Sequence, residues 1–321
     1  MASRDPVALV EKLAAGDRGA LARALSLVEQ GGQPARDVGR LAWLLGSGGA
    51  YTLGITGAPG AGKSTLTNRL ITSLRSHDDD QVAVLAIDPS SPFSGGAILG
   101  DRIRMQEHVL DSGVFIRSMA TRGHLGGLAL AAPQALRVLE AAGFPWVVIE
   151  TVGVGQVEIE VTEAADTTVV VVNPGWGDSI QANKAGLTEI ADVFVINKAD
   201  RPGVQETRAD LRNMIEMSEL AMADEHWWQP PIVATVAETG EGIDELVDAI
   251  GIHREHLVAT GKLEQRRDKR LVDELRQIVA RSMEQRAYEL TTTEQFNALV
   301  AKVRARTLDP YTAADDIISI T

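Results

Sequence analysis

An α/β fold with a mostly parallel central sheet, flanked by N-terminal and C-terminal helical extensions, is the fold class that this 321-residue sequence predicts. Three observations support it. Seven short apolar runs alternate with segments of helical periodicity, as expected for strands buried on both faces of a parallel sheet. Residues 5–45 show the helical period alone, as does the stretch from about Ile243 to Thr307. Hydrophobic residues make up 45% of the chain, which is ample for such a core.

The expected strands lie between these extensions, and each is followed by a helical segment or a polar loop. They are Tyr51–Thr56, Val82–Ile87, Val114–Ser118, Trp146–Glu150, Thr167–Val172, Val193–Asn197 and Ile232–Thr235.

Breaks in the helical pattern set the expected domain boundaries. Gly16-Asp17 and the Gly-Gly-Gln-Pro stretch at 31–34 divide the N-terminal helices, and another interruption falls near Thr260-Gly261. We expect an N-terminal helical segment at 1–46, the α/β domain at 47–255 and a C-terminal helical arm at 256–321.

A glycine-rich motif follows the first expected strand and opens the helical segment that runs from Thr65 to Leu74. The motif has the form G-x-x-x-x-G-K-[ST], and this position between a strand and a helix is the one it requires. Its backbone N–H groups would converge on phosphate oxygens, while Lys63 would reach the β- and γ-phosphates and Ser64 would bind Mg²⁺. The position argues against a coincidental glycine-rich turn, so the sequence predicts a P-loop NTPase. The motif residues are Gly57, Ala58, Pro59, Gly60, Ala61, Gly62, Lys63 and Ser64.

A second motif predicts which base is bound. Asn197-Lys198-Ala199-Asp200 ends the sixth expected strand and is typical of guanine-specific sites. The Asp200 carboxylate can accept hydrogen bonds from guanine N1–H and N2–H₂, whereas adenine would leave it unpaired. Such charge-assisted bonds contribute about 1.5–3 kcal/mol each. By itself the tetrapeptide could equally be a polar turn, but together with the P-loop it favours GTP. Thr235, Val236 and Ala237 resemble the loop that supports the base.

Acidic residues at strand ends are candidates for the metal neighbourhood. Glu150-Thr151-Val152-Gly153 ends the fourth expected strand, where a GTPase places an acidic residue near Mg²⁺ and a glycine N–H towards the γ-phosphate. Asp88 and Asp101 lie at the two ends of a loop with the composition of a switch segment. The alternative is that Asp88 belongs to a strand-end turn and Asp101 caps a helix.

The residue after this glycine predicts slow hydrolysis. Many small GTPases have a Gln there, which orients the attacking water. Val154 occupies that place here and cannot polarise water, so Gln156 or a partner residue would have to complete the site.

The chain as a whole resembles the MeaB/ArgK-type GTPases, the methylmalonyl-CoA mutase-associated branch of the metallochaperone-like P-loop GTPases. Beyond the P-loop and the guanine motif, the resemblance rests on four further blocks. They are Asp88-Pro89-Ser90-Ser91-Pro92-Phe93, Gly100-Asp101-Arg102-Ile103-Arg104-Met105, Glu150-Thr151-Val152-Gly153-Val154-Gly155-Gln156 and Thr239-Gly240-Glu241-Gly242.

The resemblance implies a homodimeric G-protein chaperone of a cobalamin-dependent acyl-CoA mutase, which gates adenosylcobalamin loading and protects the mutase from inactivation. It also implies that Gly57 to Thr65 bind the phosphates, and that the C-terminal helices form the dimer arm. The segment from Pro174 to Lys184 resembles the family's additional switch, although a simple strand-to-helix loop would also explain its glycines. Val157 departs from the family, which commonly has Ser there.

In this reading Lys63, Glu150 and Gly153 act in GTP hydrolysis. The residues implied for the Mg²⁺ neighbourhood are Ser64, Asp88, Asp101 and Glu150.

Charge and composition indicate which partners and which cellular location to expect. A formal net charge of -13 argues against binding to nucleic acid or to an anionic membrane surface. The sequence has no cysteine, no signal-peptide pattern and no apolar run long enough to span a bilayer, so we expect a cytoplasmic protein.

A pure binding module without turnover stays open, since Val154 weakens hydrolysis, and two further alternatives remain. The first is a small-molecule kinase or transport-linked ATPase, which Asp200 argues against. The second is a metal-insertion GTPase for nickel or zinc enzymes, which the lack of cysteine and the scattered placement of the 6 histidines argue against.

Overall fold

The computed structural model describes residues 5–46, 49–78, 80–89, 106–108, 110–121, 127–151, 164–175, 190–221 and 227–319. The chain divides into a first unit, Met1–Asp268, and a second unit, Lys269–Thr321. No helix among the described residues is both long and apolar enough to cross a membrane.

A seven-stranded sheet forms the centre of the first unit, in the order β3-β2-β4-β1-β5-β6-β7, and all its strand pairs are parallel. The predicted strands are confirmed, and four of them extend by one to three residues at their carboxyl ends. The strands are β1 (Tyr51–Gly57), β2 (Val82–Pro89), β3 (Val114–Thr121), β4 (Trp146–Thr151), β5 (Thr167–Val172), β6 (Val193–Asn197) and β7 (Ile232–Thr235).

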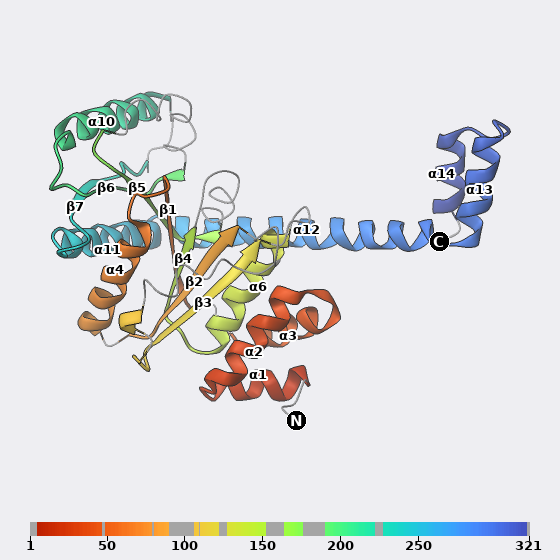
Figure 1. Cartoon of the computed structure of the whole chain (residues 1–321), viewed down its shortest axis with the longest axis horizontal. Coiled ribbons are helices and arrows are strands. Elements are labelled where there is room, and N and C mark those ends of the chain that lie inside the picture. The colour runs from red at the N-terminus through yellow and green to blue at the C-terminus, as the bar shows by residue number, and fades with distance from the viewer. Residues whose placement is uncertain are drawn as a thin grey trace. The chain divides into compact units, whose positions relative to one another are not determined.

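Helices cover both faces of this sheet, because alternate residues of each strand point to opposite faces. On β2, Leu85 packs with the N-terminal helices and α6, whereas Val84 packs with α4 and α11. Figure 1 shows these two helical layers on opposite sides of the sheet. The helices of the first unit are α1 (Pro6–Ala14), α2 (Arg18–Gln30), α3 (Gly32–Leu45), α4 (Lys63–Asp78), η1 (Gln106–His108), α6 (Gly127–Ala141), α10 (Val204–Ala221) and α11 (Ile243–Ala259).

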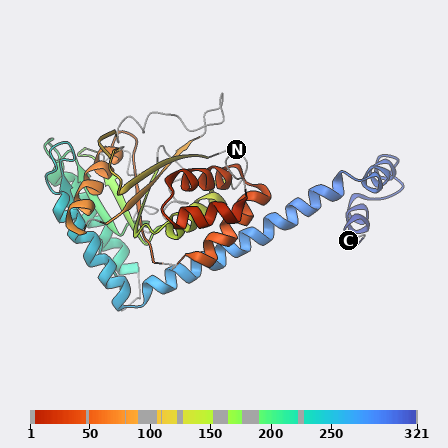
Figure 2. The ribbon, with the colours of Figure 1, turned by 90° about the horizontal axis from the view of Figure 1, so that it is seen from below.

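The three N-terminal helices pack on one another and on α6, as Figure 2 shows in red and yellow-green. Asp5 and Asp17 cap α1 and α2 by accepting hydrogen bonds from backbone N–H groups of the first turn. The predicted break at Gly16-Asp17 is confirmed. The break expected at 31–34 is shorter, because α3 begins at Gly32 and accommodates Pro34 in its first turn, where no N–H donor is needed.

The C-terminal helical pattern contains one break more than predicted. The expected interruption at Thr260-Gly261 separates α11 from α12 (Lys262–Thr291), and α12 continues from the first unit into the second. A further break follows at Thr292, after which Thr293 caps α13 (Glu294–Arg304). The last helix is α14 (Pro310–Ile318), whose N-cap is Asp309.

Candidate nucleotide site

The glycine-rich motif forms a loop from the end of β1 to the start of α4, and two of its glycines are required sterically. Gly57 has φ 137°, and a Cβ there would lie 2.1 Å from the carbonyl oxygen of Val171 on β5. Gly62 has φ 90°, and a Cβ there would lie 2.4 Å from the Asn197 side-chain nitrogen. Real Cβ atoms do not approach other atoms so closely, so only glycine allows the loop to pass this near to β5 and β6.

Carbonyl groups of this loop are held by side-chain donors. Lys63 Nζ donates to the carbonyl oxygens of Gly57 at 2.6 Å and Ala58 at 3.2 Å. Lys198 Nζ donates to Gly60 O at 2.7 Å. The carbonyl and the N–H of one peptide unit point in opposite directions. Holding the carbonyls in this way therefore orients the loop's N–H groups.

The start of α4 adds N–H groups that suit an anion. The first intrahelical hydrogen bond runs from Leu66 N–H to Gly62 O at 2.9 Å, so the N–H groups of Lys63, Ser64 and Thr65 precede the helical ladder. These groups and the positive end of the helix dipole form the site that phosphates bind in proteins.

Ser64 and Glu150 meet beneath the loop. Ser64 Oγ donates to Glu150 Oε1 at 2.5 Å, and Glu150 at the end of β4 is fully buried. A buried carboxylate requires compensation by hydrogen bonds or a cation. A hydroxyl and a carboxylate oxygen are the hard ligands that Mg²⁺ prefers, so these two residues fit a magnesium ion at the phosphates.

Asn197 at the end of β6 organises the guanine motif. Its Oδ1 accepts hydrogen bonds from Thr235 Oγ1 and from Ala237 N–H, both at 3.1 Å, while its Nδ2 donates to Ala61 O at 2.8 Å. Lys198 adopts φ 60°, a left-handed conformation that turns the chain out of the strand. Asp200 follows on this turn and is exposed to solvent, where it is accessible to a base.

The base-supporting loop after β7 is connected to the P-loop helix. Arg69 of α4 donates to the carbonyl oxygens of Ala237 at 3.1 Å and Glu238 at 2.8 Å. Val236 forms an isolated antiparallel bridge with Glu241, which closes a turn over residues 237–240. Arg69 was not expected from the sequence, because nothing in a single helix indicates which distant carbonyl its side chain reaches.

The structure therefore brings most of the predicted residues together at the carboxyl ends of the strands, the edge where ligands bind in open parallel sheets. Asp88 is the next-to-last residue of β2 and pairs with Ala120 of β3, but its side chain lies outside the described residues, as do Asp101 and Gly153. The predicted switch from Pro174 to Lys184 is described only for its first two residues.

Asn173 was not predicted, although its Nδ2 donates to Gly60 O at 3.4 Å. The available signal was a polar residue directly after a buried strand.

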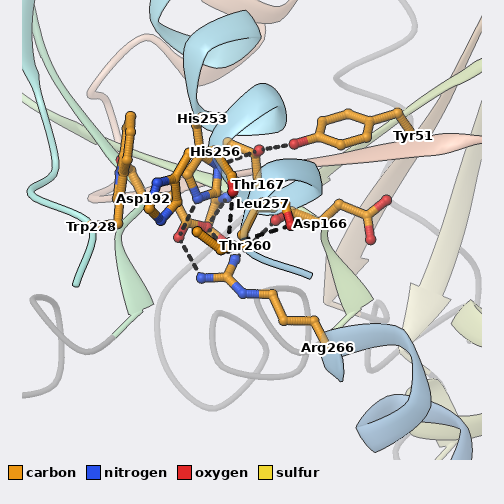
Figure 3. Close-up of polar contacts among 11 residues, drawn as sticks. Tyr51, Asp166, Thr167, Asp192, Trp228, His253, His256, Leu257, Thr260 and Arg266 are labelled. Carbon is orange, nitrogen blue, oxygen red and sulfur yellow. Dashed lines mark hydrogen bonds and ion pairs between the residues drawn. The ribbon is translucent and has the colours of Figure 1, made fainter. Parts of the chain in front are cut away.

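A second polar cluster lies at the amino ends of β5 and β6 (Figure 3). Asp192, just before β6, accepts hydrogen bonds from both terminal nitrogens of Arg266 at 2.9 and 3.1 Å and from Thr168 N–H at 2.8 Å. His253 of α11 is fully buried, and its Nε2 lies 3.2 Å from Asp192 Oδ1, off the direction of a strong hydrogen bond. Its Nδ1 lies 2.7 Å from Thr167 Oγ1.

The same cluster fixes the start of α12 to the sheet. Arg267 pairs with Asp166 at 2.7 Å and donates to Ala50 O at 2.9 Å. Although burial alone would raise it, the neighbouring His253 and Arg266 side chains hold the pKa of Asp192 below its usual value. Burial raises the pKa of Tyr51, whose hydroxyl contacts Thr167, to about 12. The cluster is distant from the P-loop along the strands, so we assign it to stability.

The fold and the site together define a class. A parallel sheet carrying a P-loop, a buried carboxylate beneath it and an Asn-Lys-x-Asp turn beside it is that of a P-loop GTPase.

The comparisons identify the family. The family model described as "Methylmalonyl Co-A mutase-associated GTPase MeaB" matches residues 21–292, and the chain belongs to this family. A putative GTPase of Pyrococcus abyssi is 48% identical over 97% of this chain and 95% of its own length. GTPase ArgK of Escherichia coli is 36% identical over 94% of this chain and 92% of its own. A solved structure described as a LAO/AO transport system kinase is 28% identical, covers 100% of this chain and 98% of its own, and has a TM-score of 0.66.

Proposed function

We propose that this GTPase is a G-protein chaperone of a cobalamin-dependent acyl-CoA mutase. It binds GTP with Mg²⁺, and GTP turnover gates adenosylcobalamin loading and protects the mutase from inactivation. The family carries the assignment of the partner, because its members are described as associated with methylmalonyl-CoA mutase. We propose a cytoplasmic location, in agreement with the composition of the chain.

The contact between Ser64 and Glu150 is the observation that carries the metal-dependent part of the proposal. Ser64 would hold Mg²⁺ directly, Glu150 would complete its neighbourhood, Asp88 would approach from the carboxyl end of β2, and Asp101 from the segment that follows it. When bound, the ion would neutralise charge on the β- and γ-phosphates. Because Glu150 is buried, the local dielectric constant is low and its carboxylate would interact strongly with a bound cation.

This chain's own residues would divide the remaining tasks. Lys63 would exchange its loop carbonyl partners for phosphate oxygens and offset charge that develops during transfer. Gly153 would direct its N–H to the γ-phosphate. Asp200 would accept the two guanine N–H groups, which adenine does not have. Val154 provides no group that orients water, so basal hydrolysis would be slow.

The partner would supply what the basal site lacks. We propose that binding of the mutase orders the loops around the γ-phosphate, including the segment from Pro174 to Lys184, and so accelerates hydrolysis. Completing a GTPase site can increase turnover by about 10³–10⁵-fold. Linkage requires the reverse effect as well, so the nucleotide state must change the affinity for the mutase.

A turnover assay with and without purified methylmalonyl-CoA mutase tests this function, and the double variant Gln181→Ala with Lys184→Ala tests the loop. We expect slow basal hydrolysis, a clear acceleration by the mutase and a weaker acceleration of the double variant. If the mutase binds and leaves turnover unchanged, gating is wrong. A double variant that responds normally would remove this loop from the mechanism.

We also propose that the chain forms a homodimer through its C-terminal helices. In the second unit, Leu271, Leu275, Val279 and Met283 recur every fourth residue along α12 and are 41%, 60%, 54% and 60% exposed. An exposed apolar stripe of this kind is typical of an interaction surface. Leu275→Glu combined with Val279→Glu should produce monomers in analytical ultracentrifugation. The exposed charge change Asp273→Asn on the same helix should not, and a double variant that stays dimeric would exclude this interface.

A further inference from the structure

Asn173 occupies a position between the P-loop and the segment that follows β5. It is the first residue after that strand, and its Nδ2 donates to the carbonyl oxygen of Gly60 at 3.4 Å. Lys198 Nζ donates to the same carbonyl at 2.7 Å. Two strand-end side chains from β5 and β6 therefore converge on one peptide group of the phosphate loop.

The orientation of the Asn173 amide shows that this contact has a cost. With Nδ2 directed to Gly60, Oδ1 is buried and has no hydrogen-bond partner among the residues that the structure describes. A rotated amide would place two acceptor oxygens against each other, so the donor must face the loop. A buried acceptor without a donor is unfavourable for folding. Such a local cost is expected at functional sites rather than in a core optimised for stability.

The chain after Asn173 is fixed a second time, to the helix that follows the guanine motif. Gly175 N–H donates to Thr207 Oγ1 at 3.2 Å, and Thr207 is buried on α10. The turn at residues 173–175 thus connects the P-loop at one end with α10 at the other. It also forms the start of the segment that we propose to respond to nucleotide.

We propose that Asn173 is a positioning residue for the guanine nucleotide. By holding the Gly60 carbonyl away from the phosphates, it keeps the neighbouring N–H groups directed towards them. Through the same hydrogen bond, nucleotide bound in the P-loop stabilises the turn at residues 173–175. This inference rests on the proposed binding of GTP at this P-loop.

Two substitutions at this position separate the effects of donor and shape. Asn173→Ala removes the hydrogen bond and should weaken GTP and GDP binding about three- to tenfold, the range for one neutral hydrogen bond. Asn173→Asp keeps the shape but places a carboxylate oxygen near the Gly60 carbonyl and the phosphates. It should weaken binding more than Asn173→Ala. Both variants should raise KM while changing kcat little, because the contact acts on bound substrate and transition state alike.

Thr207→Val provides the matched control, because it removes the acceptor of Gly175 N–H at nearly constant shape and does not touch the P-loop. It should leave nucleotide affinity within about twofold of the wild type. Hydrogen–deuterium exchange supplies a second readout. GDP should slow exchange of the peptide that covers residues 173–175 in the wild type but not in Asn173→Ala.

Specific outcomes would overturn the inference. Wild-type nucleotide affinity in both Asn173 variants would exclude a role for this hydrogen bond. An equal loss of affinity in Thr207→Val would also exclude it, because the effect would then come from folding of the turn. A wild-type protein that binds neither GTP nor GDP would instead overturn the proposed function. If the wild type binds GTP and GDP and the Asn173 variants bind them with the same affinity, only the role of Asn173 would be excluded.

Discussion

The side-chain amide of Asn197 donates a hydrogen bond of 2.8 Å to the backbone carbonyl of Ala61. These residues are 136 positions apart in the sequence, and the contact joins the guanine motif to the phosphate loop. Because the amide oxygen of Asn197 also accepts from Thr235 and Ala237, one side chain connects three loops of the site. The Asn197 side chain therefore stabilises both the base-supporting loop and the phosphate loop.

Guanine selectivity is expected to depend on Asp200. Asp200→Asn replaces a double acceptor with an amide, so GTP and GDP should bind tenfold or more weakly, and xanthine nucleotides should gain relative affinity. Competition binding with GTP, XTP and ATP measures this. Equal affinity of the unmodified protein for ATP and GTP would contradict guanine recognition and favour the small-molecule kinase or transport-linked ATPase.

Substitutions of the phosphate-binding Lys63 and the metal-binding Ser64 are expected to have different effects on turnover. Lys63→Ala should abolish turnover, because it removes the cation at the phosphates. Ser64→Ala should remove most of the dependence of turnover on Mg²⁺ concentration, since it deletes a metal ligand and the hydroxyl that contacts Glu150. Turnover assays across a magnesium titration measure both. Unchanged hydrolysis by Lys63→Ala would exclude the P-loop from the reaction.

Two glycines of the loop form a matched pair. Gly62→Ala should abolish nucleotide binding, because its Cβ would lie 2.4 Å from Asn197 Nδ2 at φ 90°. Gly60 has φ 73°, but a Cβ there would meet no atom within 4 Å. Gly60→Ala should therefore cost only about 1–2 kcal/mol of backbone strain. Fluorescent GDP binding and thermal melting should be measured on both. Equal behaviour of the two variants would show that contact with Asn197 is unimportant.

Acid stability is expected to depend on Asp192. Since its pKa is lower in the folded protein, the folded state binds this proton less readily than the unfolded state. The stabilisation is therefore present above the unfolded carboxyl pKa of about 3.9 and is lost as pH falls through the folded pKa. Asp192→Asn should lower the free energy of unfolding at neutral pH by about 1–3 kcal/mol, because the amide cannot replace both carboxylate oxygens that pair with the partly exposed Arg266 and accept from Thr168 N–H.

Denaturant unfolding from pH 7 to pH 3 measures this dependence. The Asp192→Asn variant should lose less of its stability over the acid range than the wild type. The control Asp273→Asn breaks an exposed pair with Arg276 and should change stability by less than about 1 kcal/mol. Identical acid dependence of the wild type and Asp192→Asn would show that this carboxylate does not control the transition.

Local features of the sequence were sufficient for the strands and for the P-loop. The strand from Val193 to Asn197 has the predicted bounds, and its first four residues are an uninterrupted apolar run, as expected for a strand covered on both faces. The motif from Gly57 to Ser64 was recognisable because backbone curvature around phosphate requires glycine at fixed spacing. The chemistry expected of Asp200 and Lys63 followed from their residue types together with their positions in the two motifs.

The sequence by itself determined the fold class, the phosphate loop and the residue that we propose to bind guanine, because periodicity and motif spacing are properties of neighbouring residues. Only the tertiary structure decided which distant groups meet. The strand order places β5 beside β1, and this brings Asn173 to Gly60. It likewise places Arg69 at the base-supporting loop and Asp192 at Arg266. Such contacts depend on strand order and side-chain reach, which a linear pattern does not encode locally.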